Sequence, residues 1–131
     1  MWEAGDLVDG WYGDAYPGAH GWAVFDVLVI EVPQIYSLRQ SKGGLKGQND
    51  LIDLAVSAGE VIGVHRTQST EIVIYRPREW KGQVPKEVMT RRIKGKVDEE
   101  ERARLDLPRA ESKHHNVWDG VGIGLKYWGR L

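Results

Sequence analysis

The run VFDVLVI at residues 24–30 decides the fold class of this chain of 131 residues. It is continuous in β-branched and apolar residues, which is typical of a strand buried on both faces of an α/β sheet. Glu31 follows the run, and Pro33 prevents further strand pairing. We therefore expect a carboxylate at the carboxyl end of a buried strand, where α/β folds place their active sites.

The segments downstream of this strand alternate between helix and strand signals. A polar, glycine-rich basic loop is expected at 37–48, with Asn49 as the N-cap of a helix at 50–62 that Gly63 ends. The apolar face of that helix is expected to comprise Leu51, Leu54, Ala55, Ala58, Val61 and Ile62. The further expected elements are a buried strand at 72–75, a loop at 80–83, and short helices at 85–93 and 98–104. This order predicts one α/β or α+β domain over residues 1–131.

The last helix is expected at about 113–128 and carries three internal glycines. They cost about 2–3 kcal/mol relative to alanine, so we expect close packing, for example against a sheet, to compensate. The expected apolar face consists of Val117, Val121, Leu125 and Trp128, and the glycines are Gly120, Gly122 and Gly124.

Asp119 is a second candidate for chemistry, because an aspartate is unfavourable inside a helix. Asn116 and His115 precede it by three and four positions, so both can share one helix face with it. Mg²⁺ takes oxygen ligands, usually one or two carboxylates with several waters. Glu31 and Asp119 could bridge such an ion if the last helix packs across the strand end. The alternative for Glu31 is a strand-end carboxylate on the surface.

The formal net charge of −1 conceals a polarised distribution of charge. Residues 1–38 contain six acids and no Lys or Arg, whereas residues 39–131 contain all 18 basic residues and 13 acids. The segment 76–96 alone holds eight basic residues and two acids. Such polarity suggests an anionic partner, and the alternative is a solvated, salt-bridged surface. The basic loops suit a phosphate backbone, and Trp80 could stack on an unpaired base or serve only in packing.

Composition excludes several classes of protein and site. The chain has no cysteine, which rules out disulfides and thiolate metal sites and fits a reducing compartment such as the cytoplasm. No apolar run approaches the ~20 residues that a membrane-spanning helix needs. Phosphate loops, dinucleotide-binding fingerprints and nucleophile elbows are not found in the sequence.

Four segments resemble a known family when they are taken together and in order. They are VLVIEVPQIY (27–36), KGGLKGQNDLIDLAVSAGEVIG (42–63), YRPREWKGQVPKEVMTRR (75–92) and KHHNVWDGVGIGL (113–125). The chain resembles the RuvC-type Holliday-junction resolvases and is most similar to the small RuvC-like nucleases of phage and prophage genomes. The resemblance covers roughly residues 24–131, about four-fifths of the chain.

The resemblance implies a ribonuclease-H-like fold, with a mixed five-stranded sheet flanked by helices. It also implies a structure-selective endonuclease that cuts branched or four-way junction DNA by Mg²⁺- or Mn²⁺-dependent hydrolysis, as a homodimer in a bacterial or phage-infected cell. The family's metal-site residues map onto Glu31, Asn116 and Asp119. Asn116 stands where the family usually has Asp or His, and His115 is the adjacent alternative. The expected DNA-binding residues are Lys42, Lys46, Arg78, Trp80, Lys81 and Lys86.

The chain departs from the family pattern at its N-terminus. The family begins with a central strand that ends in an IDPG-like turn and supplies the first catalytic Asp. Here MWEAGDLVDGW resembles the family's second strand, so the first strand is expected to be missing or replaced. In a second alignment Leu7-Val8-Asp9-Gly10 forms a makeshift first strand, and Asp9 supplies the acid.

Three functions therefore compete at the level of sequence. The first is a RuvC-like endonuclease, and the second is a catalytically impaired DNA-binding remnant of the same fold. The third is a protein-interaction module whose basic surface is incidental. Strong salt dependence of DNA binding would count against the third, because phosphate contacts weaken steeply with salt.

Overall fold

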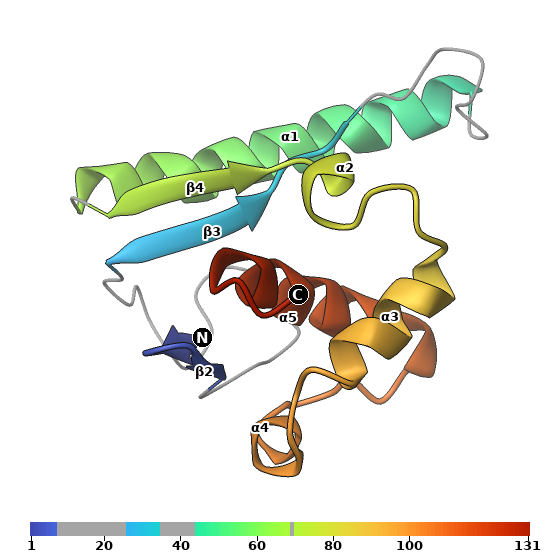
Figure 1. The fold of residues 1–131 in the computed structure, drawn as a ribbon. Coiled ribbons are helices and arrows are strands. Elements are labelled where there is room, and N and C mark those ends of the chain that lie inside the picture. The colour runs from blue at the N-terminus through green and yellow to red at the C-terminus, as the bar shows by residue number, and fades with distance from the viewer. Residues whose placement is uncertain (8–25, 35–43, 69) are drawn as a thin grey trace.

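The computed structural model describes residues 1–7, 26–34, 44–68 and 70–131. Its centre is a two-stranded parallel sheet formed by β3 (Val27–Glu31) and β4 (Glu71–Tyr75), in which Glu31 pairs with Tyr75. Helix α1 (Gly44–Thr67) connects the two strands and lies along one face of the sheet, while α5 (His114–Tyr127) lies on the other (Figure 1). The protein is therefore of mixed α/β class.

Both strands begin close to where the sequence predicts them, but the expectation of a strand buried on both faces is wrong. All five residues of β3 are half-buried, and Ile74 in β4 is 44% exposed. Within the described residues each strand has a single neighbour, so one edge of each is left without a partner strand. Val24 and Phe25 lie outside the described residues.

Helix α1 is longer than predicted at both ends. It begins at Gly44, so Asn49 is inside the helix rather than its N-cap, and it continues through Gly63 to Thr67. An internal glycine costs only about 1 kcal/mol in a helix, and packing against β3 and β4 can offset that cost. Of the predicted apolar face, Ala58 is buried, whereas Leu54 is 56% exposed.

The segments after β4 are short helices that lead to α5. Trp80 and Lys81 were expected in a loop, but Trp80 closes a one-turn helix that starts with Pro77, and Lys81 is its C-cap. The described helices here are α2 (Pro77–Trp80), α3 (Lys86–Lys94), α4 (Glu99–Ala103) and the 3₁₀ turn η1 (Glu111–Lys113). Helices α3, α4 and α5 agree with the sequence prediction to within a few residues.

The hydrophobic core lies on the α5 side of the sheet rather than between the sheet and α1. Its most buried side chains include Ile93 from α3, Leu125 from α5 and Leu7 from the N-terminal hairpin. Trp118 is also buried there, whereas Trp128, which was expected on the apolar face of α5, is 42% exposed. Because α5 is buried against α2, α3 and β3 at once, its position fixes how the strand end meets the last helix.

Two glycines of α5 allow large side chains to approach the helix backbone. A Cβ atom on Gly122 would lie 2.6 Å from the Trp80 ring and 2.7 Å from Ile93 Cδ1, and one on Gly124 would overlap the Trp2 ring. The third glycine, Gly120, has no such neighbour within 4 Å. Close packing therefore accounts for two of the three glycines, and the close partners are tryptophan and isoleucine side chains rather than the sheet.

The N-terminal residues form a separate two-stranded antiparallel sheet, β1 (Trp2–Glu3) with β2 (Asp6–Leu7). Among the described residues, this hairpin does not pair with β3 or β4. Asp9 and residues 8–25 lie outside the described part of the chain. Among the described residues there are two small sheets, which is less than the five-stranded sheet that the resemblance implies.

Candidate functional site

Glu31 and the segment 76–81 meet because β3 and β4 are parallel. Parallel strands end at the same edge of a sheet, and Glu31 lies directly opposite Tyr75. Pro77 stops strand pairing after Tyr75 and starts α2, since its fixed φ suits the first turn of a helix. One turn later the chain reaches Lys81, close to where β3 ends.

The ammonium group of Lys81 lies between the two candidate carboxylates. Its Nζ atom is 3.6 Å from Glu31 Oε2 and 3.5 Å from Asp119 Oδ2. The side chains of all three residues are between 27% and 30% exposed, so they line the surface without being fully solvated. The structure thus brings together the strand-end Glu and the helical Asp, which are 88 positions apart in the chain.

Trp80 orients the Glu31 carboxylate through a hydrogen bond. Its indole Nε1–H donates a hydrogen bond of 2.5 Å to Glu31 Oε2, and Lys81 Nζ lies 4.7 Å from the centre of the same indole. The ring is only 5% exposed and packs against Gly122. A buried indole needs a partner for its N–H, and here the partner is the candidate ligand.

Three residues of α5 line a shared hollow next to this contact. His115, Asn116 and Asp119 line a pocket of about 430 Å³, together with Lys81 and Lys86. The expectation that the three share one helix face therefore agrees with the structure. The carboxylate of Asp119, an unfavourable residue inside a helix, contacts the ammonium group of Lys81.

The donor set fits a hard divalent cation in part. Glu31 and Asp119 already accept one positive charge between them, and two carboxylates with waters are a usual Mg²⁺ arrangement. Asn116 can add a carbonyl oxygen, and His115 a ring nitrogen. In the described ranges no group of three or more His, Asp or Glu side chains is gathered closely enough to hold a metal.

The predicted DNA-binding residues are divided between described and undescribed parts of the chain. Lys42 lies outside the described residues, and Lys46 lies in the first turn of α1, where only the backbone is described. Arg78 lines a hollow beside α3, and Lys86 lines the pocket with Asp119. Trp80 is buried against α5, which agrees with the packing alternative and leaves no open ring face for a base.

Sequence reasoning assigned Lys81 to phosphate contacts and missed its position between the acids. The signal that could have revealed it is the pairing direction of the strands, because two parallel strands bring 31 and 76–81 to one edge. Arg91, Arg92 and Lys96, which line the hollow beside α3, were also missed as individual residues. Only the excess of basic residues in 76–96 pointed to them.

Comparisons with protein-family models, curated proteins and solved structures find no match to this chain. In the described residues, no helix has the length and apolar character needed to cross a membrane.

Proposed function

We propose that this chain is a metal-dependent, structure-selective endonuclease of branched DNA, with a RuvC-like, ribonuclease-H-like organisation. One observation supports the proposal above others: Glu31 at the end of β3 and Asp119 on α5 approach the same cation, Lys81 Nζ. A metal-dependent phosphodiesterase needs acids that converge on one cation, and these two acids converge on the position that the ammonium group now holds.

In this proposal Glu31 and Asp119 hold Mg²⁺ or Mn²⁺, with Asn116 or His115 as the weaker ligand. The bound ion would polarise the phosphodiester and lower the pKa of an attacking water. Trp80 holds the Glu31 carboxylate beside Lys81 through its N–H donor. Lys81 and Lys86 supply positive charge beside Asp119, where a phosphate would lie.

Replacing Glu31 tests the metal-site assignment directly. Glu31→Gln keeps an oxygen that can accept the Trp80 hydrogen bond but removes the charge, so we expect cutting of four-way junctions with Mg²⁺ or Mn²⁺ to fall at least 100-fold. Binding of the same junction, measured by gel shift without metal, should change less than threefold. Glu71→Gln is the matched control, since Glu71 is an exposed acid at the other end of the parallel sheet. Equal cutting by the Glu31 and Glu71 variants would show that Glu31 is not a ligand.

A catalytically impaired DNA-binding protein of the same fold is the second candidate. Two observations favour it: Lys81 already occupies the space between the two carboxylates and offsets one of their two negative charges, and Asn116 brings no charge to the site. The same experiment separates the two functions. Wild-type protein that shifts junction DNA in a salt-dependent manner but does not cut it with either metal would support the second candidate.

The homodimer that the family resemblance implies is part of the proposal. Ile52 and Val56, one turn apart on α1, are 60% and 57% exposed. Exposed apolar side chains on one helix face favour association with another surface. Sedimentation equilibrium of the wild type and of Ile52→Glu would measure this directly, and a wild-type monomer at high micromolar concentration would exclude it.

A further inference from the structure

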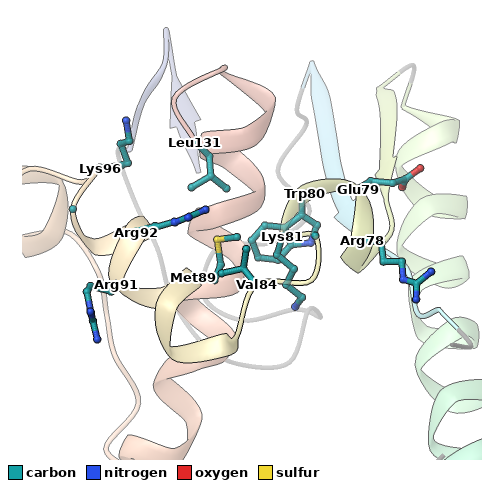
Figure 2. A pocket seen from close by; sticks show the side chains of 12 residues that line it. Arg78, Glu79, Trp80, Lys81, Val84, Met89, Arg91, Arg92, Lys96 and Leu131 are labelled. Atoms are coloured by element: carbon teal, nitrogen blue, oxygen red, sulfur yellow. The ribbon is translucent and has the colours of Figure 1, made fainter. Parts of the chain in front are cut away.

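A basic hollow lies between α3 and the turn that links α2 to α3. It measures about 660 Å³, and its walls carry Arg91, Arg92 and Lys96 on the α3 side and Arg78 and Lys81 on the α2 side (Figure 2). Its apolar lining comes from Val84, Met89 and Leu131. Of the described residues that line it, Glu79 is the single acid, and it accepts a hydrogen bond from the Arg76 backbone N–H. Positive charge therefore dominates the hollow.

The cations on the α3 side have no acidic partner within the described part of the chain. No carboxylate there lies within 4.0 Å of the charged groups of Arg91, Arg92 or Lys96, and all three residues are exposed. Neighbouring exposed cations repel one another, and a bound anion would relieve that repulsion.

The helix and the following turn that carry these cations are anchored to the core and to Arg130. Met89 and Ile93 anchor α3 in the core, and the Lys96 carbonyl accepts a hydrogen bond of 2.9 Å from Arg130. The backbone positions that present the cations are therefore fixed before any ligand arrives, which lowers the entropic cost of binding.

The basic hollow adjoins the pocket that Asp119 lines. Both hollows are lined by Lys81, Gly82, Val84 and Met89, so they lie on the two sides of one turn. Gly82 has a φ of +61° at this turn, a conformation that favours glycine, and a Cβ atom there would meet nothing within 4 Å. A small anion could fill only one of the two hollows. A chain of regularly spaced phosphates could extend from the pocket at Asp119, over the turn, to Arg92 in the basic hollow.

We infer that Arg91, Arg92 and Lys96 form a second phosphate-binding surface, which holds the DNA backbone that flanks the phosphate at Glu31 and Asp119. This inference rests on the proposed function for its ligand and adds the direction in which the bound strand leaves the site. The surface contacts phosphates rather than base edges, so it contributes affinity and position without reading sequence.

The test is the salt dependence of DNA binding. The α3 variant carries three substitutions together, Arg91→Gln, Arg92→Gln and Lys96→Gln. It should bind a four-way junction at least tenfold more weakly than the wild type in EDTA at 100 mM salt. Its slope of log K against log [salt] should be shallower by about 2–3, since each lost phosphate contact removes about 0.9. The single variant Arg92→Gln should make the slope shallower by about 1. The double variant Arg91→Lys, Arg92→Lys keeps both charges and should show the wild-type slope.

The control variant removes the same charge elsewhere. Arg66, Arg109 and Lys126 are exposed and line neither hollow, so their replacement by Gln should change the slope by less than 0.5. Equal slopes for the two triple variants would overturn the inference. Poly-glutamate and unlabelled DNA can also be compared as competitors of junction binding. If poly-glutamate competes as strongly as DNA at equal negative charge, the inference is overturned and an acidic protein partner is indicated.

Failure of the second phosphate-binding surface can be distinguished from failure of the proposed nuclease function. If the wild type cuts junctions and the α3 variant binds like the control, the second surface is wrong and the nuclease stands. If the wild type binds but never cuts, and the α3 variant loses affinity as stated, the surface stands and the nuclease is wrong.

Discussion

At the residue scale, the Lys81 side chain connects the two carboxylates of the candidate site. Its ammonium group lies within 3.6 Å of both Glu31 and Asp119, and it also lines both hollows. Two carboxylates that approach each other repel unless a cation lies between them. Lys81 supplies that cation in the structure, and a divalent metal would compete for the same oxygens.

Removal of Lys81 should therefore strengthen metal binding. We expect Lys81→Met to bind Mn²⁺ about tenfold more tightly than the wild type, because the metal no longer displaces an ammonium group. At saturating Mn²⁺ this adds about 1.4 kcal/mol of stabilisation, or about 5 °C in the melting temperature. Differential scanning fluorimetry with and without Mn²⁺ measures the increment.

Lys86→Met is the matched control for this experiment. Lys86 lines the same pocket but makes no ion pair with Glu31 or Asp119 among the described contacts. The Lys86 variant should show the wild-type increment with Mn²⁺. An equal increment for both lysine variants would mean that Lys81 does not compete with a metal.

At the scale of elements, α5 determines the geometry of the site because it touches the sheet, α2 and α3 (Figure 1). Its Gly122 sets how closely Trp80 approaches. Trp80 in turn is hydrogen-bonded to Glu31, so the packing of one helix is connected to the position of a candidate ligand on a strand. Helix α1, by contrast, packs on the far face of the sheet and leaves Leu54 exposed.

Alanine substitutions in α5 should have opposite effects at neighbouring glycines. Gly122→Ala places a methyl group 2.6 Å from the Trp80 ring, so we expect a loss of about 1–3 kcal/mol in the free energy of unfolding. Gly120→Ala meets nothing within 4 Å and should gain up to about 1 kcal/mol from helix propensity. Urea denaturation of both variants gives the comparison. A Gly122→Ala protein as stable as Gly120→Ala would show that Trp80 does not pack as described.

At the scale of the whole molecule, one ion pair with a buried carboxylate connects the two ends of the described chain. Glu101 is 3% exposed, and Arg130 contacts its two carboxylate oxygens at 2.7 and 2.9 Å. Arg130 also donates to the Gly5 carbonyl, and the Leu7 N–H donates to Glu101 Oε1. The N-terminal hairpin, α4 and the C-terminus are therefore held through a single carboxylate.

This ion pair predicts how stability depends on pH. The hydrogen bonds from Arg130 lower the pKa of Glu101 from 4.5 to about 2, although its burial acts in the opposite direction. Because the pKa is lower in the folded state, the contribution is complete above pH 4.5 and is lost as the pH falls towards 2. The shift corresponds to about 3 kcal/mol.

Glu101→Gln should remove this part of the acid sensitivity. Chemical denaturation between pH 7 and pH 2 should show a variant that is about 3 kcal/mol less stable at pH 7 and changes less with pH. Glu100→Gln is the control, since Glu100 pairs with Arg104 but its side chain is 79% exposed. Parallel pH profiles for the Glu101 variant and the wild type would contradict the assignment.

The sequence by itself determined the elements that depend on local periodicity and composition. The apolar run before Glu31 predicts β3, and the spacing of Val117, Val121 and Leu125 predicts α5. It also placed Glu31 at a strand end and put His115, Asn116 and Asp119 on one helix face. These predictions succeed because hydrophobic spacing reports which side of an element is buried, a property of neighbouring residues.

Only the tertiary structure decided what these elements bring together. It extended α1 past Asn49 and Gly63, buried Trp80 against Gly122 and placed Lys81 between the two acids. Lys81 is 50 positions from Glu31 and 38 from Asp119, so no local pattern encodes their contact. The physical reason is that a side chain's environment follows from the packing of whole helices and strands, whereas periodicity describes one element at a time.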